Sequence, residues 1–226
     1  MSEQAVLKLE KLKKSYDGKR FVLDGIDLEL FPGDMAIIEG KSGSGKSTLM
    51  NIIGLLDGFD DGNLFLCGED ASSLTVKQQA GLRAEKIGFV FQAYHLIEAI
   101  TVRENILLPF LYRGAEDETQ LRNRFDLITE ELGLKELLNR KAGLLSGGEK
   151  QRTAIARAVI KDPVMILADE PTGNLDPENT EIVIRAFRRL RDEGKLIITV
   201  THDISIANAE DRCFYLKEGR LTQCME

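Results

Sequence analysis

A glycine-rich loop at residues 40–48 constrains the fold of this chain more than any other stretch of its sequence. The loop follows a short apolar run at residues 35–38, typical of a buried strand, and precedes residues 49–53, which read as a helix. Such a loop turns tightly and points backbone N–H groups at an anion, with Lys46 reaching the outer phosphates and the Ser47 hydroxyl binding Mg²⁺. The motif predicts a nucleotide site made of Gly40, Lys41, Ser42, Gly43, Ser44, Gly45, Lys46, Ser47 and Thr48.

Composition limits the classes of function that this site can serve. The 226 residues are enough for one α/β domain, which we expect to span residues 1–226. A net charge of −7 at pH 7 argues against a broad basic surface, so no nucleic-acid partner is expected. No apolar run approaches the roughly 18 residues of a spanning helix, so another chain would have to cross any membrane. The three cysteines are far apart and odd in number, which favours reduced thiols in a cytosol.

Strand and helix patterns alternate along the chain. Residues 5–31 read as a β-rich lobe, because residues 26–30 alternate apolar and polar side chains. Further short strands are expected at residues 62–68, 87–91, 164–168, 196–200 and 212–217. Residues 93–157 are dominated by helical spacing and are expected to form a helical subdomain set into the sheet. The pattern predicts an α/β fold with a mostly parallel sheet and its polar motifs at the carboxyl ends of the strands.

An acidic pair, Asp169-Glu170, follows the strand expected at residues 164–168. Asp169 at the end of a buried strand can hold Mg²⁺, directly or through water. Glu170 beside it can polarise a water for attack on a terminal phosphate. An acidic pair after a strand is also a common helix N-cap signal. The phosphate loop in the same chain favours the catalytic interpretation.

A second anion-binding helix start is indicated at residues 145–152. Ser146 is a favourable N-cap, and Gly147 and Gly148 leave backbone N–H groups uncovered at the first turn. An ordinary capped helix would explain Ser146 but not two consecutive glycines, each of which costs helix stability. The pattern therefore favours an anion site.

With these motifs in place, the sequence resembles the nucleotide-binding subunits of ATP-binding cassette (ABC) transporters over almost its whole length. Residues 40–48 match the Walker A loop, residues 165–170 the Walker B strand, and residues 145–152 the signature motif. Shorter matches are Gln92 of the Q-loop, Asn174, Leu175 and Asp176 of the D-loop, His202 of the switch motif and Tyr16 as the adenine-stacking aromatic residue. The resemblance implies a RecA-like P-loop NTPase with an N-terminal antiparallel β lobe and an inserted α-helical subdomain.

The resemblance also implies roles for individual residues. Glu170 and His202 would be catalytic, and Ser47, Gln92 and Asp169 would hold the Mg²⁺ that accompanies ATP. The other nucleotide contacts would come from Tyr16, the Walker A loop, Gln92, Ser146, Gly147, Gly148, Glu149 and Asp176. Glu149 departs from the commonest family signature, which has glutamine, and leaves the serine and both glycines intact.

Partners follow from the same resemblance. In this family each signature motif completes the site of a second subunit, so the working unit would be a nucleotide-sandwich dimer of two copies. The dimer would power a transmembrane permease from the cytoplasmic face of the cell membrane. Short motifs at residues 54–57, 91–96, 104–109 and 167–176 are similar to those of one subgroup. That subgroup contains macrolide exporters, lipoprotein-release systems and antimicrobial-peptide resistance transporters, which implies export, lipoprotein release or mechanotransmission.

The main alternative is a soluble ABC ATPase that acts in DNA maintenance or translation. DNA-maintenance members carry a long coiled-coil insertion between the two nucleotide motifs, and translation-associated members carry two cassettes per chain; neither feature is found here. A small P-loop kinase or GTPase is a third possibility, and the Ser146-Gly147-Gly148 run and Gln92 argue against it.

An apolar stretch lies between Gln92 and Tyr112 and contains Tyr94, Leu96, Ile97, Ile106, Leu107, Leu108, Phe110 and Leu111. All of it could pack inside the helical subdomain. Alternatively, part of it could form an exposed groove in which a permease helix docks. On the second interpretation Leu96 is exposed, and Leu96→Glu would abolish membrane recruitment without changing ATP affinity.

Overall fold

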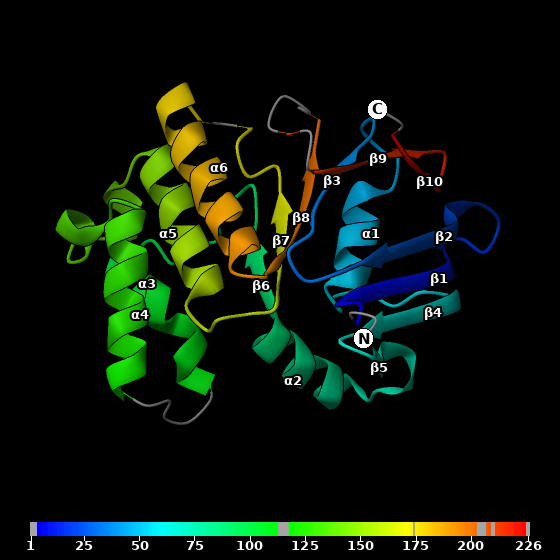
Figure 1. Cartoon of the computed structure of the whole chain (residues 1–226), viewed down its shortest axis with the longest axis horizontal. Helices are drawn as coiled ribbons and strands as arrows, with labels where there is room; N and C mark the ends of the chain where they lie inside the picture. Colours follow the sequence, from blue (N-terminus) through cyan, green and yellow to red (C-terminus); the bar gives the residue numbers. More distant parts are fainter. Residues whose placement is uncertain (1–3, 113–117, 174, 203–206, 209–210, 225–226) are drawn as a thin grey trace.

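The computed structural model describes residues 4–112, 118–173, 175–202, 207–208 and 211–224. Two β-sheets lie next to each other, and a group of helices packs against the larger sheet on the side away from the smaller one (Figure 1).

The larger sheet has the strand order β10-β9-β3-β8-β7-β6. Its strands are β3 (Met35–Glu39), β6 (Ile87–Val90), β7 (Met165–Asp169), β8 (Leu196–Thr201), β9 (Arg212–Lys217) and β10 (Arg220–Gln223). Neighbours from β9 to β6 run parallel, and the β9–β10 pair is antiparallel. The central strands β3, β7 and β8 are buried along almost their whole length, which explains their continuous apolar runs. The mostly parallel sheet expected from the sequence is confirmed.

The smaller sheet is antiparallel, with the order β2-β1-β4-β5. It consists of β1 (Leu7–Ser15), β2 (Phe21–Leu30), β4 (Asp61–Leu66) and β5 (Glu69–Asp70). This is the expected antiparallel lobe, completed by strands that follow the phosphate loop in sequence. Helix α1 (Lys46–Ile53) lies between the two sheets (Figure 1) and buries four apolar side chains there, those of Leu49, Met50, Ile52 and Ile53.

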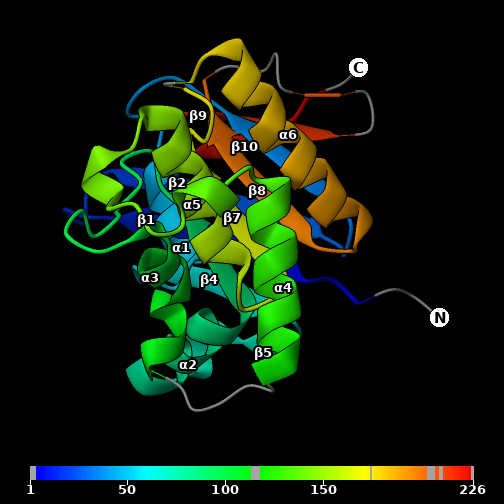
Figure 2. The ribbon, with the colours of Figure 1, turned by 90° about the vertical axis from the view of Figure 1, so that its left-hand side faces the viewer.

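The remaining helices are α2 (Val76–Lys86), α3 (Val102–Leu107), α4 (Glu118–Glu131), α5 (Gly147–Val159) and α6 (Pro177–Asp192). Four of them, α3 to α6, gather on the far side of the large sheet (Figures 1 and 2). They share a second apolar core, in which Phe125, Ile155 and Phe187 pack with Ile166 of β7. Short 3₁₀ turns lie at Ala71–Ser73, Leu108–Tyr112, Lys135–Leu137 and Ala142–Leu144.

The helix starts follow the capping chemistry of the sequence. Thr75, Thr101 and Ser146 each form a reciprocal capping box with the residue three positions later, and Asp176 caps α6 ahead of Pro177. The helical subdomain was expected to begin at residue 93. Residues 91–101 contain no helix, and the first helix of this part, α3, begins at Val102.

The apolar stretch before Tyr112 is divided between core and surface. Ile106 is fully buried, and Leu96 is half-buried against the second core, so the expectation that Leu96 is exposed is wrong. Ile97 and Leu111 are the exposed members, at 48% and 73% of their surface. A charge at Leu96 would therefore disturb packing as well as any surface contact.

Candidate active site

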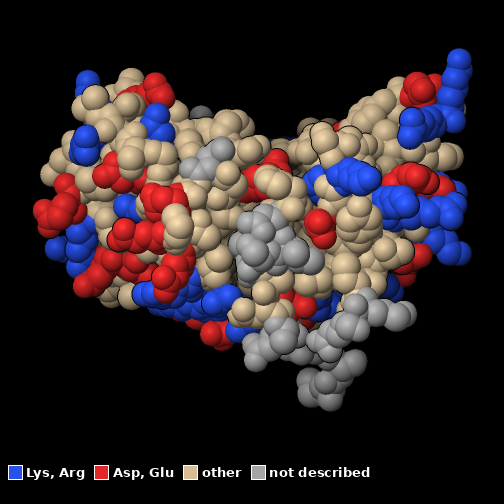
Figure 3. All heavy atoms as spheres, turned by 90° about the horizontal axis from the view of Figure 1, so that it is seen from above, with Lys and Arg blue, Asp and Glu red and all other residues tan. Residues whose placement is uncertain are grey.

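A cavity of about 540 Å³ opens at the carboxyl ends of β3 and β7, the upper edge of the large sheet in Figure 1. Sequence-predicted residues from four separate segments line it: Gly40, Lys41, Ser42, Gly43, Gly45, Lys46, Ser47, Thr48, Gln92, Asp169, Glu170 and His202. Figure 3 views this face from above; basic side chains predominate over the antiparallel lobe, and acidic and basic side chains are mixed over the helices. The cavity is where these motifs converge.

The phosphate loop has a conformation that requires glycine at Gly45. This residue has a φ of 104° and precedes α1, and a Cβ on it would lie 2.9 Å from the carbonyl oxygen of Val22. Lys46 Nζ donates to the carbonyl oxygens of Gly40 at 2.5 Å and Lys41 at 3.1 Å, so its ammonium lies against the loop. Ser44 Oγ is buried and has no hydrogen-bond partner in the described part of the chain. Since buried polar atoms are normally paired, this hydroxyl and the helix N-terminus fit a bound anion.

The acidic pair lies on the opposite wall, where β7 ends beside β8. Glu170 has a left-handed backbone, with a φ of 45°, and its N–H donates to the carbonyl oxygen of Val200 at 2.8 Å. Its carboxylate is held on both sides: Thr201 Oγ1 donates to Oε2 at 3.0 Å, and His202 Nδ1 lies 2.8 Å from Oε1. A strained non-glycine residue with a fixed side chain is a frequent feature of functional sites.

Asp169 is half-buried beside Glu170. Burial raises the pKa of the Asp169 carboxyl, the negative charge of Glu170 raises it further, and Lys46 opposes both effects. The ionised carboxylate is therefore poorly stabilised by the protein alone. A cation bound there would supply the missing positive charge. Among the described residues, no group of three or more His, Cys, Asp and Glu side chains is arranged around a single metal position.

The signature residues lie outside the cavity, at the start of α5. Ser146 Oγ accepts from the Glu149 N–H at 3.3 Å, and Glu149 Oε2 accepts from the Ser146 N–H at 2.7 Å. The hydrogen bond from the Ser146 backbone is the largest of several effects that hold the pKa of Glu149 below its usual range. Glutamine could make the same reciprocal contacts, so the departure at Glu149 preserves the capping box and changes its charge.

A polar cluster ties the signature helix to the D-loop helix. Asp176 accepts from the backbone N–H of Asn179 at 2.8 Å and from its carboxamide at 2.7 Å. The same carboxamide accepts a hydrogen bond from Arg152 of α5. A Cβ on Gly148 would overlap the Asn179 carboxamide, so a larger residue there would displace that side chain from its contacts with Asp176 and Arg152. Asn174, the first D-loop residue of the resemblance, and Asp203 after the switch histidine lie outside the described residues.

Tyr16 follows the last residue of β1, outside the cavity lining, and is 64% exposed. Its Oη donates to Asp57 Oδ2 at 2.8 Å, and Lys14 Nζ donates to the other oxygen of Asp57 at 3.1 Å. The Lys14 ammonium also lies 4.8 Å from the centre of the Tyr16 ring. These contacts fix an exposed aromatic ring, as a base-stacking surface requires.

Arg157 connects α5 with the segment that follows Gln92. Its guanidinium donates to the carbonyl oxygens of His95 at 2.5 Å and Tyr94 at 2.7 Å, and burial lowers its pKa. Tyr94 and His95 both have left-handed backbones. His95 is exposed and packs on the ring of Phe91.

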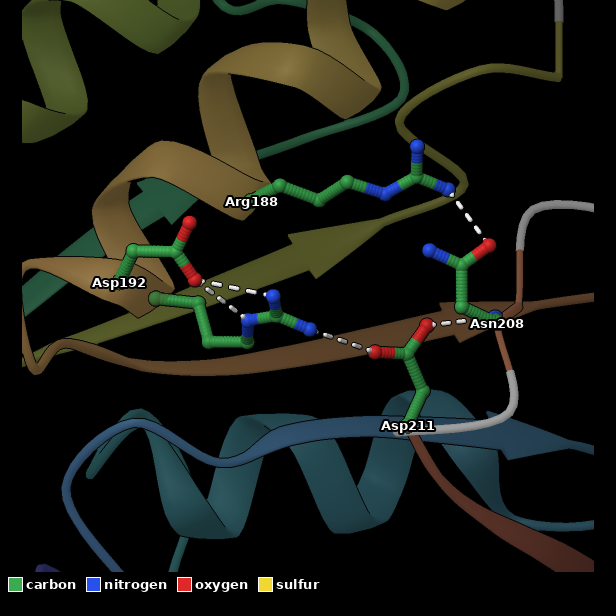
Figure 4. A network of polar contacts seen from close by, with 5 residues as sticks. Arg188, Asp192, Asn208 and Asp211 are labelled. Atoms are coloured by element: carbon green, nitrogen blue, oxygen red, sulfur yellow. Dashed lines mark hydrogen bonds and ion pairs between the residues drawn. The ribbon is translucent and has the colours of Figure 1, made fainter.

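A second network joins the end of α6 to the segment before β9 (Figure 4). Arg188 donates to Asn208 Oδ1 at 2.9 Å, and Arg191 bridges Asp192 and Asp211. Asp211 also accepts from the Asn208 N–H at 2.8 Å, and its side chain is fully buried. The network fixes the geometry between α6 and the strand that neighbours β3.

Sequence reasoning found the residues that line the cavity, apart from Val22, but not those that position them. Glu170 is held by Thr201, Tyr16 is held by Asp57, and the segment after Gln92 is held by Arg157. Thr201 and Asp57 belong to short motifs noted in the sequence, yet only the folded chain shows which atoms they meet.

A parallel sheet whose strand β3 leads through a glycine-rich loop into a helix, with an acidic pair at the end of β7, defines a P-loop nucleotide-binding fold. Residues 23–173 match the family model described as ABC transporter, and the chain belongs to that family.

Individual relatives support the same assignment. The chain is 42% identical over 221 residues to the lipoprotein-releasing system ATP-binding protein LolD 1 of Rhodopseudomonas palustris, covering 96% of this chain and 98% of that protein. It is 39% identical over 224 residues to the macrolide export ATP-binding/permease protein MacB of Pasteurella multocida, covering 98% of this chain but only 34% of that protein. It thus spans about a third of the length of the macrolide export relative.

A solved ATP-binding cassette, a dimer in a post-hydrolysis state bound to ADP and Pi, matches with a TM-score of 0.86 and 36% identity, covering 97% of this chain and 99% of that one. These similarities confirm the predicted fold, the resemblance to the macrolide-export and lipoprotein-release subgroup, and ATPase activity. They favour an ATPase of membrane transport over the DNA-maintenance or translation alternative. In the described residues, no helix is long and apolar enough to cross a membrane.

Proposed function

We propose that residues 1–226 form one ABC ATPase domain, with residues 93–157 as its helical subdomain, and that ATP is hydrolysed in the cavity between the phosphate loop and Glu170. The convergence of Lys46, Gln92, Glu170 and His202 on one cavity carries this proposal. Lys46 and the N–H groups of the loop would bind the phosphates. The Glu170 carboxylate, oriented by Thr201 and His202, would accept the proton of the attacking water.

The residues around the cavity also fit Mg²⁺. Ser47, Gln92 and Asp169 supply hydroxyl, carbonyl and carboxylate oxygens, the donors that this ion prefers. Burial and the negative charge of Glu170 raise the pKa of Asp169, so a bound cation would stabilise its ionised form. Bound Mg²⁺ would neutralise charge on the phosphates. Tyr16, held by Asp57, would stack on the adenine base.

We further propose that two copies form the complete site, each contributing its signature and D-loop residues to the nucleotide of the other. This is supported by the position of Ser146, Gly148 and Asp176, which do not line the cavity of their own chain. Two variants test the arrangement: Lys46→Ala removes the phosphate cation, and Ser146→Arg blocks the signature. Each alone should abolish hydrolysis, and a mixture should regain part of it through one intact composite site. A mixture as inactive as either variant would contradict it.

The permease would dock in a groove of about 480 Å³ between β6, the end of α2 and α5, here called the Phe91 groove. Its apolar lining includes Leu56, Phe89, Phe91 and Pro109. Its charged lining residues are mostly basic: Arg83, Arg157 and Lys161, with Glu85. An amphipathic helix with apolar and acidic residues has matching chemistry. Phe91 precedes Gln92, so a helix in this groove would contact the segment that senses the nucleotide.

Leu56→Glu tests this docking, because Leu56 lines the groove and is 48% exposed. The variant should keep ATPase activity in solution and lose co-sedimentation with membranes that contain the permease. Val76→Glu is the matched control, since Val76 is 83% exposed and lies outside the groove. If Leu56→Glu co-sediments with these membranes as well as Val76→Glu does, the Phe91 groove is not the docking site. Recruitment by the permease would hold the chain at the cytoplasmic face of the membrane. The net charge of −7 argues against a nucleic-acid partner.

A further inference from the structure

Two cysteines that are distant in sequence are direct neighbours in the fold. Cys213 lies in β9, and Cys224 follows the last residue of β10. The register of this antiparallel hairpin pairs Gln223 with Phe214, and the Cys224 N–H donates to the Cys213 carbonyl oxygen at 2.9 Å. Cys224 therefore stands directly opposite Cys213. The expectation that the cysteines are far apart holds along the sequence but not in space.

Residues opposite each other across an antiparallel pair project their side chains from the same face of the sheet. Their Cα atoms are about 5.5 Å apart when the pair is hydrogen-bonded, within the roughly 4.4–6.8 Å range of disulfides. Cys224 is exposed and Cys213 half-buried, so small oxidants can reach the pair. The Cβ atoms of opposite residues are about 4.5–5.5 Å apart, whereas a disulfide needs about 3.5–4.5 Å, so closing the bond requires a small backbone shift. Cys224 follows the last residue of β10, where such a shift breaks no further strand pairing in the described residues.

We propose that Cys213 and Cys224 form a reversible disulfide site, oxidised by a small-molecule disulfide such as oxidised glutathione. The exposed Cys224 thiolate attacks the glutathione disulfide, forms a mixed disulfide and releases one glutathione thiolate. Cys213 then loses its proton to solvent and attacks the Cys224 sulfur, which releases the second glutathione. The two protein thiols are oxidised by two electrons, and one glutathione disulfide is reduced to two thiols.

The environments of the two thiols support this order. Burial raises the pKa of the Cys213 thiol, and the adjacent Cys224 is among the groups that raise it further. Cys213 is therefore the weaker first nucleophile and the natural resolving thiol. The third thiol, Cys67, lies in the turn between β4 and β5 of the other sheet and provides an internal reference.

The disulfide would fasten an edge strand to the main sheet. β10 is paired with β9 alone in the large sheet, and β9 is paired with β3, the strand that leads into the phosphate loop. Residues 215–219 of the same hairpin line a second cavity with Lys41, Ser42 and Ser44 of that loop. Oxidation would therefore act on a hairpin that touches the loop.

The test is oxidation of the folded, full-length chain with increasing ratios of oxidised to reduced glutathione, followed by trypsin digestion and mass spectrometry. Trypsin cuts after Arg212, Lys217 and Arg220, so the linked product consists of peptides 213–217 and 221–226 joined by one bond. We expect this product in the wild type, where Cys67 should stay reduced, and also in Cys67→Ser, and dithiothreitol should reverse it in both proteins. Cys213→Ser should stop at the mixed disulfide of Cys224 with glutathione.

Three results would overturn the proposal. One is a wild-type chain that stops at the Cys224–glutathione mixed disulfide although Cys213 is present. Another is a Cys67 thiol that is linked as readily as the pair, which would indicate unspecific oxidation. The third is a linked product that forms only after the chain has been unfolded in urea, because the folded register is what brings the two sulfurs together.

Discussion

Nδ1 of His202 lies 2.8 Å from Oε1 of Glu170, while Oγ1 of Thr201 donates to the other carboxylate oxygen at 3.0 Å. Two consecutive residues at the end of β8 thus hold the carboxylate at the end of β7. Because the parallel register pairs Asp169 with Val200, the sheet itself places these groups side by side. The orientation of Glu170 is therefore a property of the β7–β8 pair.

Thr201 is predicted to be a positioning residue for Glu170. Thr201→Val keeps the shape of this fully buried side chain and removes the hydroxyl, so kcat for ATP should fall by about 10–100-fold with little change in KM. Thr201→Ser, which keeps the hydroxyl, should restore most of the activity, whereas a purely structural role would show as a lower melting temperature in both variants. Wild-type kcat in Thr201→Val would exclude the positioning role.

Asp169 is predicted to destabilise the folded protein when no nucleotide is bound. Its folded-state pKa is raised, so the folded state binds the proton more tightly than the unfolded chain does, and stability is lost as pH rises from the ordinary carboxyl pKa through the raised one. Asp169→Asn should therefore melt at a higher temperature than wild type near neutral pH, without nucleotide. The advantage should vanish below the ordinary pKa of about 3.9. Thermal denaturation of the wild type and of Asp169→Asn across this pH range tests the prediction. An Asp169→Asn protein that melts below the wild type at neutral pH would contradict it.

Tyr16 is predicted to bind the adenosine part of ATP in an orientation set by Asp57. Tyr16→Phe keeps the ring and loses the hydrogen bond to Asp57, so ATP affinity should fall by roughly fivefold, the equivalent of about 1 kcal/mol. Affinity for inorganic tripolyphosphate should stay unchanged, because it contacts the phosphate loop only. Equal losses for both ligands would place Tyr16 in a general structural role.

The sequence predicted the fold well where each local pattern has one structural solution. The run from Met35 into the phosphate loop and the Ser146 cap are local signals, and both were found in place. Contacts between distant segments were out of reach, since nothing in the sequence pairs Arg152 with Asn179. The error at Leu96 has the same origin: burial against α-helices that come later in the chain removes a surface that composition alone suggested.

Glu170→Gln tests the central claim most directly. The substitution keeps the size of the side chain and removes its ability to accept a proton, so ATP binding should persist while hydrolysis falls by orders of magnitude. With turnover blocked, ATP should convert the monomer to a dimer in size-exclusion chromatography, and Ser146→Arg in the same chain should prevent this. A purified Glu170→Gln protein that hydrolyses ATP at the wild-type rate would remove Glu170 from the mechanism and contradict the account.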